Sequence, residues 1–151
     1  MEEEYVKLMK CIIETDKYKS LKNYIHHKKI SVYDHSIAVA NLCYKYAKKK
    51  NLNIDYKSLI RAALLHDYYL YDWHEKGKWH KPHGYKHPKI ALENALKDYP
   101  DLNDIEKDSI LRHMFPLTII PPKYKEGWVL QKCDKEATLI DYKIKKSNDN
   151  K

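Results

Sequence analysis

Histidine and aspartate residues interrupt apolar segments at several points in this sequence. His35 lies one turn before Val39 on a predicted apolar stripe, the pair His66-Asp67 ends a short apolar segment, and Asp134 lies in a third such segment. Burying an unpaired polar group in such places costs several kcal/mol. A metal ion satisfies imidazole and carboxylate groups together, so the pattern predicts a metal site in the core of a helical bundle.

The adjacent pair His66-Asp67 defines the expected geometry of this site. Successive side chains on a helix diverge by about 100°, so both residues can reach a site beside the helix end. The two oxygens of Asp67 can bridge two cations. The first cation would be completed by His35, His66 and Asp134, and the second by His87 and His113. This mixed ligand set favours Fe, Mn, Co, Ni or Zn over Mg, so we expect one or two divalent transition metal ions.

The elements that must position these residues are predicted to be helices. The chain has 151 residues, 43% of them hydrophobic and only 3 of them Gly, which fits one helical domain. Apolar residues recur at helical spacing in most of the chain. The predicted helices cover about 2–14, 18–27, 31–50, 55–66, 88–98, 103–114 and 125–144, with Ser31, Asp55 and Asn103 or Asp104 as N-caps.

These elements predict an all-α fold, a single compact bundle of five or more helices around the metal centre. An N-terminal helical segment at 1–29 would pack on a metal-binding core at 30–145, followed by a frayed tail at 146–151. Pro88 fits the first position of its helix, which would place His87 at the helix start. In the last helix we expect Val129, Cys133, Ala137 and Ile140 to face the core.

The segment at 68–86 has no hydrophobic period and is rich in aromatic residues. Long structureless segments of a compact domain are often binding loops or lids, so we interpret it as a loop packed over the site. Its aromatic side chains could stack on a nucleobase, but packing against the core is the favoured interpretation. These residues are Tyr68, Tyr69, Tyr71, Trp73 and Tyr85.

Charge and cysteine content narrow the class of protein. There are 29 Lys and Arg against 21 Asp and Glu, a formal charge of +8, but the lysines are dispersed, which argues against a nucleic-acid partner. Cys11, Cys43 and Cys133 are too far apart for a thiolate zinc site, and we expect them to be small buried residues. No apolar run approaches the roughly 20 residues that a membrane span needs, and the first residues do not resemble a signal peptide. We therefore expect a cytoplasmic protein with no membrane partner.

The segments that hold the first four candidate ligands resemble a known family. SVYDHSIAVANLC with His35, RAALLHDYYL with His66-Asp67, and QKCDKEATLID with Asp134 are similar to the HD-domain superfamily of metal-dependent phosphohydrolases. His87 in GYKHPKIALENA and His113 in ILRHMFPLT resemble the two additional ligands of its dinuclear members. The resemblance spans about residues 30–142.

This resemblance implies an HD-type all-α fold and a metal-dependent phosphohydrolase. A metal-activated water would cleave a phosphate ester of a nucleotide or another small phosphorylated metabolite, with Asp67 as the catalytic bridge. Whether the ester is a monoester or a diester stays open. Many members follow the HD pair with a small residue and a substrate-binding lysine, but here Tyr68, Tyr69 and Leu70 follow. We expect His83, Lys86 and Arg112 to bind substrate instead.

Two other functions compete with hydrolysis. Some relatives with a similar ligand set hold two irons and activate dioxygen, and the ligand types do not separate the two chemistries. A non-catalytic, basic module that binds nucleic acid is the third alternative, although no motif of interleaved basic and aromatic residues supports it. We rank the phosphohydrolase first, the diiron oxygenase second and the binding module third.

Overall fold

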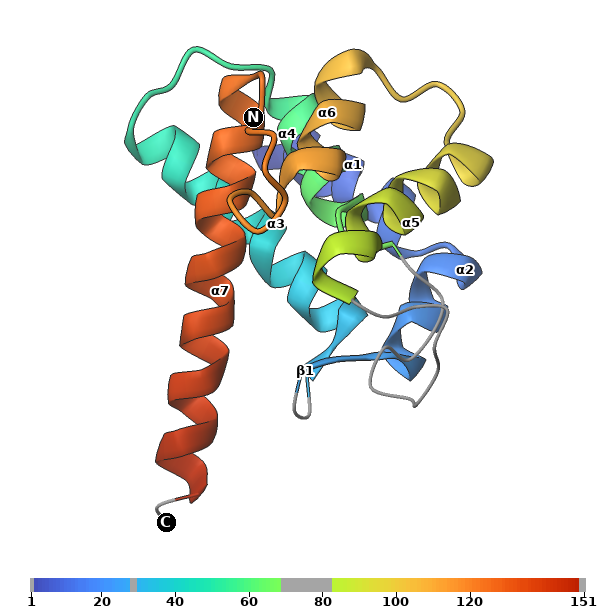
Figure 1. Ribbon diagram of the computed structural model, residues 1–151. Coiled ribbons are helices and arrows are strands. Elements are labelled where there is room, and N and C mark those ends of the chain that lie inside the picture. Colours follow the sequence, from blue (N-terminus) through green and yellow to red (C-terminus); the bar gives the residue numbers. More distant parts are fainter. Residues whose placement is uncertain (1, 28–29, 69–82, 150–151) are drawn as a thin grey trace.

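The computed structural model describes residues 2–27, 30–68 and 83–149. Within these ranges most residues lie in helices (Figure 1). The helices are α1 (Glu2–Ile13), α2 (Asp16–Lys19), the short 3-10 helix η1 (Ser20–Asn23), α3 (Val32–Lys49), α4 (Tyr56–Leu65), α5 (His83–Asp98), α6 (Asp104–Arg112) and α7 (Lys125–Asp149). Strands β1 (Ile25–His27) and β2 (Ile30–Ser31) form a two-stranded antiparallel sheet. The predicted all-α class is confirmed.

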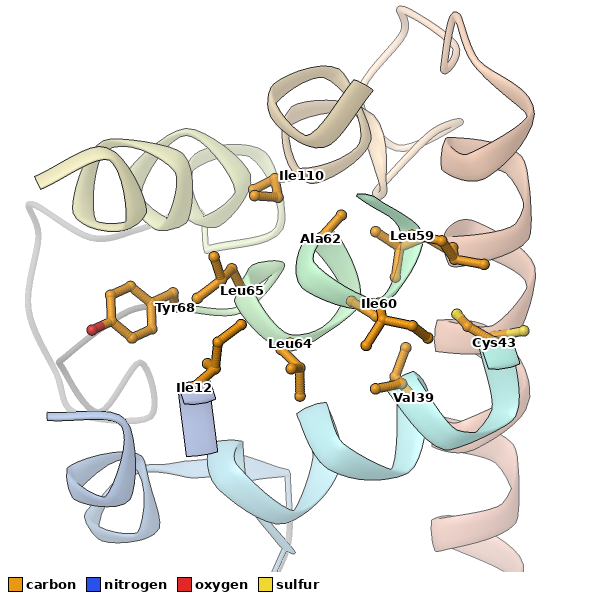
Figure 2. Close-up of a cluster of buried hydrophobic side chains, with 14 of the residues drawn as sticks. Ile12, Val39, Cys43, Leu59, Ile60, Ala62, Leu64, Leu65, Tyr68 and Ile110 are labelled. Carbon is orange, nitrogen blue, oxygen red and sulfur yellow. The ribbon is translucent and has the colours of Figure 1, made fainter. Parts of the chain in front are cut away.

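Helix α4 lies at the centre of the bundle. It contacts α1, α3, α5, α6 and α7. Leu59, Ile60, Leu64 and Leu65 are all buried, and each side chain removed from water in this way contributes about 2 kcal/mol. Figure 2 shows these side chains between Ile12 of α1, Val39 and Cys43 of α3, and Ile110 of α6. The short apolar segment that ends at His66-Asp67 therefore forms the helix predicted at 55–66, and this helix is buried in the core.

The predicted N-caps are present. The side chains of Ser31, Asp55 and Asn103 each accept a hydrogen bond from a backbone N–H in the first turn of α3, α4 and α6. Asn103 and Glu106 form a full capping box, because the Glu106 carboxylate also accepts from the Asn103 N–H. Three of the helices that carry candidate ligands therefore begin where the sequence predicts.

The predicted helix at 18–27 is wrong. Only α2 and η1 are helical there, and Tyr24 is already extended. The Tyr24 carbonyl accepts a hydrogen bond from the N–H of Val32, and β1 pairs with β2. These pairings satisfy the backbone groups that a longer helix would have satisfied internally.

Three further expectations need correction. Helix α5 begins at His83, so Pro88 lies inside it and His87 is not at its start; Pro88 forfeits one backbone hydrogen bond while the remaining turns persist. Cys11 is exposed, because it lies about 100° from Ile12, the buried neighbour on α1. Ile140 is 41% exposed, because it lies in the second half of α7, which extends beyond the other helices (Figure 1).

The expected loop at 68–86 lies mostly outside the described residues. Tyr68 is described, and it packs as expected: the ring is buried and its hydroxyl donates to Asp98 Oδ2 at 2.7 Å. At the other end, the residues from His83 onward are helical rather than part of a loop. Within the described residues, no helix combines the length and apolar character that crossing a membrane would require.

Candidate metal centre

The structure brings together all six residues that the sequence singles out as ligands. One nitrogen or oxygen from each of His35, His66, Asp67 and Asp134 lies within 4.8 Å of the others. The same holds for a second group formed by Asp67, His87 and His113. The side chains come from five different helices or their ends, and Asp67 belongs to both groups.

The C-terminal end of α4 presents His66 and Asp67 to this centre. A helix end leaves carbonyl groups without an internal partner. Here the Ala63 carbonyl accepts from His66 Nδ1 at 2.6 Å, and the Leu64 carbonyl accepts from the buried Tyr18 hydroxyl at 2.6 Å. The Leu65 carbonyl accepts from the N–H of Tyr68. The helix therefore ends with its carbonyls paired and with the His66 ring fixed by one of them.

Helix α6 repeats this arrangement at its own end. His113 occupies the C-cap, as His66 does in α4, and its Nδ1 donates to the Ile110 carbonyl at 2.6 Å. Because a carbonyl oxygen can only accept, Nδ1 must carry the proton in both rings. In the neutral rings, Nε2 then keeps its lone pair, and in both residues it is Nε2 that faces Asp67. In both His66 and His113, a hydrogen bond at the helix end therefore favours the tautomer that can bind a metal through Nε2.

The carboxylate of Asp67 lies between the two groups. Its Oδ2 is 3.1 Å from His66 Nε2 and 3.5 Å from His35 Nε2. Its Oδ1 is 3.0 Å from His87 Nε2 and 3.4 Å from His113 Nε2. The side chain is only 1% exposed. One oxygen therefore serves each group, as a bridging carboxylate requires.

Asp134 and His35 complete the first group. Asp134 Oδ1 is 2.8 Å from His35 Nε2 and 3.4 Å from His66 Nε2. The His35 ring is fully buried, and the Asp134 side chain is 13% exposed. In the second group, His87 Nε2 and His113 Nε2 are 2.9 Å apart. Because His113 Nδ1 donates to a carbonyl, His87 must donate to His113 Nε2 when both rings are neutral.

These separations fit the edges of metal coordination polyhedra. Nitrogen and oxygen ligands bind first-row divalent metals at about 2.1 Å, which places neighbouring ligand atoms about 3.0 to 3.4 Å apart. The distances between neighbouring ligand atoms in this structure, from 2.8 to 3.5 Å, lie close to that range. His66 Nε2 is also buried without a hydrogen-bond partner among the described residues. The donor set therefore fits divalent metal ions in both groups.

The pKa values show that the first group attracts positive charge. Burial lowers the pKa of His35, but hydrogen bonding to Asp134 and Asp141, together with the charges of Asp134 and Asp67, outweighs it and raises the pKa to about 9. Burial likewise opposes protonation of His66, yet Asp67 and Asp134 raise its pKa well above the usual value. Burial raises the pKa of Asp134, but His66 and His35 bring it well below the usual value.

The second group behaves differently. Burial lowers the pKa of His113, and the neighbouring His66 and His87 add to this, against the opposing effect of Asp67. A neutral His113 is the form that a metal needs.

Asp141 is a residue that sequence reasoning missed. It lies two turns after Asp134 on α7, and its Oδ2 is 3.9 Å from His35 Nδ1. A carboxylate behind a ligating histidine increases the basicity of that histidine. The spacing of seven residues from Asp134, on the same face of a helix, is the signal that could have identified it.

The predicted substrate-binding residues are placed only in part. His83 and Lys86 lie in the first turn of α5, and their side chains are outside the described structure. Arg112 immediately precedes His113, and its Nε lies 3.9 Å from Asp108 Oδ1, one turn earlier on α6. The substrate role of these three residues stays a prediction.

Comparison with known proteins agrees with this site. A family model described as HD domain matches residues 32–141, a range that contains all six clustered residues and ends at Asp141. The comparisons with curated proteins and with solved structures gave no match. Since the family model covers well over half of the sequence, the chain belongs to the HD domain family.

Proposed function

We propose that this protein is a dinuclear metal-dependent phosphohydrolase that cleaves a phosphate ester of a nucleotide or another small phosphorylated metabolite. The observation that carries the proposal is the position of Asp67, with Oδ2 toward His35 and His66 and Oδ1 toward His87 and His113. Membership of the HD domain family supports metal-dependent hydrolysis as the class of reaction.

The charge of the ligand set favours an anionic substrate. Two carboxylates, Asp67 and Asp134, and four neutral imidazoles carry a charge of about −2, which two divalent cations would turn into about +2. A phosphate monoester carries close to −2 at neutral pH. Divalent cations bound here would lower the pKa of water and polarise the phosphoryl oxygens.

The protein groups then act by holding this arrangement. Asp67 spans both groups, while His66 and His113 are fixed by the carbonyls of Ala63 and Ile110. His35 is held between Asp134 and Asp141. Such preorganisation removes the cost of arranging ligands during the reaction. We propose that Asp67 is the residue on which activity depends most.

Metal analysis of protein purified without chelator and without a nickel column tests the proposal. We expect about two transition metal ions per chain, and about one in a His87→Ala/His113→Ala double variant. Asp67→Ala should abolish metal-dependent hydrolysis of phosphate esters while the helical circular dichroism remains. Asp101→Asn, which changes an exposed aspartate paired with Arg61, is the matched control and should retain the metal and the activity.

Three results would contradict the proposal. An unchanged metal count in the double variant would make His87 and His113 structural. An active Asp67→Ala variant would remove Asp67 from the mechanism. Oxygen consumption by the iron-loaded protein, without hydrolysis of any phosphate ester, would replace the phosphohydrolase with an oxygenase.

A further inference from the structure

A cavity lies away from the metal centre, between α1, α3 and α4. Its volume is about 450 Å³, within the range of about 300 to 1,000 Å³ that small-molecule sites occupy. Tyr5, Tyr44 and Tyr56 line it with aromatic rings, and Leu8 and Ile60 add aliphatic surface. The cavity therefore offers a mostly apolar surface to a ligand.

This cavity uses the opposite ends of the helices that carry the metal ligands. On α3, the lining residue nearest to His35 is Tyr44, nine residues later, and on α4 the lining residue nearest to His66 is Ile60, six residues earlier. Six residues of α-helix span about 9 Å and nine span about 13 Å. The cavity and the metal centre are therefore separate sites on a shared pair of helices.

The aromatic wall is held by interactions within the protein. The rings of Tyr5 and Tyr44 stack with centroids 4.1 Å apart and planes 13° from parallel, and Tyr56 meets Tyr44 edge-on. The Tyr5 hydroxyl donates to Asn41 Oδ1, and the Tyr56 hydroxyl to the carbonyls of Ala47 and Leu52. A surface that is already ordered loses little conformational entropy on binding a flat ligand.

Positive charge surrounds this wall. The ammonium group of Lys48 lies 4.4 Å from the centroid of the Tyr56 ring and 5.7 Å from that of Tyr44. Lys7 and Lys57 also line the cavity, and the carboxylate of Glu4 offsets one of these three charges. The net positive charge beside an apolar wall favours a ligand that has both a flat apolar body and an anionic group.

We propose that this cavity binds a small amphipathic anion, with its flat body against the three tyrosines and its anionic group near Lys48 and Lys57. The site is independent of the proposed hydrolysis, because it shares no residue with the metal centre. A cysteine in the cavity can report on binding. Cys11 lines the cavity and is exposed, whereas Cys43 and Cys133 are buried. A bound ligand should therefore shield the Cys11 thiol from a small alkylating reagent.

The probe 8-anilinonaphthalene-1-sulfonate has the required chemistry, a flat aromatic body with one sulfonate. We expect the metal-loaded full chain to bind it saturably, and saturation to slow the alkylation of Cys11 by N-ethylmaleimide severalfold. Lys48→Met and Lys57→Met should each weaken binding by about tenfold, the size expected for losing one charge-assisted contact. Lys49→Met, at the neighbouring exposed position of α3 outside the cavity, is the matched control and should bind as the original protein does.

Further variants separate this cavity from other places where the probe could bind. Asp67→Ala tests the metal centre, and Ile119→Ser tests an apolar side chain that is 87% exposed elsewhere on the molecule. Neither change should affect the binding. The proposal is overturned if saturable binding is absent, if it is unaffected by Lys48→Met, if Cys11 is not protected, or if binding is lost in Asp67→Ala or Ile119→Ser instead.

Discussion

At the scale of single residues, the buried carboxylate of Asp67 depends most strongly on its surroundings. A carboxylate with 1% exposure needs positive charge close by, because an isolated buried charge is strongly unfavourable. Four histidine nitrogens lie within 3.5 Å of its two oxygens. Protonation of His35 and His66 supplies positive charge when no cation is bound, as their raised pKa values show. Protons and metal ions therefore compete for the same ring nitrogens of His35 and His66.

Asp141 gives a prediction at this scale. Replacing it with Asn removes the negative charge 3.9 Å from His35 Nδ1, so His35 becomes a weaker base and a weaker ligand. We expect metal affinity to fall by about tenfold or more, as for other partners of ligating histidines, with the saturated metal count unchanged. Competition with a chelator of known affinity measures the first quantity, and elemental analysis measures the second.

The control for this variant is Asp101→Asn, which removes the same charge at a surface position. Histidine NMR titration of the metal-free protein gives an independent reading, since the pKa of His35 should fall below about 9 in Asp141→Asn. Equal metal affinity in Asp141→Asn and Asp101→Asn would show that Asp141 does not act on His35.

Four of the six clustered residues, His35, His66, Asp67 and Asp134, could be proposed because they interrupt apolar segments, and the resemblance to HD domains supported His87 and His113 as the other two. His35, His66 and Asp134 lie beside residues that are themselves buried, such as Leu65 and Cys133, so a polar side chain there requires a partner. Asp141 interrupts no comparable pattern, since Ile140 beside it is exposed. Its position beside His35 depends on how α3 and α7 pack, and local sequence patterns do not predict the packing of two helices that are far apart in the chain.

At the scale of elements, α4 and α6 are linked at their N-caps and each ends in a histidine of the metal centre. Asn103, the N-cap of α6, donates from its side-chain amide to Ser58 Oγ at 2.8 Å, and Ser58 in turn donates to Asp55, the N-cap of α4. The two helices have nearly equal length, Tyr56–Leu65 and Asp104–Arg112, and each ends in a histidine C-cap. Joining their starts therefore helps to place His66 and His113 together, with ring centroids 4.8 Å apart.

Substitution of Asn103 tests this coupling. Asn103→Ala removes both the helix cap and the bond to Ser58, and it should lower the free energy of unfolding by about 1 to 2 kcal/mol. Asn103→Ser keeps a capping oxygen but cannot reach Ser58 with an amide, so it should cost less stability while still loosening the pair. Urea denaturation measures both values.

Metal affinity distinguishes the two roles of Asn103. If the bond to Ser58 helps to align the helix ends, both variants should bind metal more weakly than the original protein. If Asn103→Ser binds metal as tightly as the original protein, Asn103 acts only as a cap for α6.

Caps were predictable because they depend on residues a few positions apart, as Ser31, Asp55 and Asn103 show. The sheet of β1 and β2 was not, because strands of two or three residues are too short to show a period. The start of α5 was misjudged because Pro88 resembles a first helical residue, yet a helix can include proline when it loses only one backbone bond.

At the scale of the whole molecule, the metal centre couples folding to both pH and metal. In the metal-free protein, the folded-state pKa of His35 is about 9, against an ordinary value of 6.5, and that of His66 is also raised. A group with a raised folded-state pKa contributes stability fully below its unfolded value and loses that contribution as pH rises through the folded value. For His35 alone the contribution is on the order of 3 kcal/mol.

The metal-free protein should therefore lose stability as pH rises from about 7 to about 8.5, where His35 and His66 begin to release protons that the unfolded chain has already lost. His113 does not oppose this, because its lowered pKa affects stability only below about 6.5. The extra stability that bound metal gives over the metal-free form should instead increase with pH. Metal binding needs neutral histidines, so affinity and the stabilisation it provides both increase with pH.

Urea denaturation across this pH range, with chelator and with saturating Mn²⁺ or Zn²⁺, measures the difference in free energy of unfolding between the two forms. We expect this difference to widen steadily with pH. In a His87→Ala/His113→Ala variant the widening should persist, because His35 and His66 remain in the first group. A difference that stays constant from about pH 7 to about pH 8.5 would mean that protons and metal do not compete at His35 and His66, and the assignment of these two residues as ligands would fail.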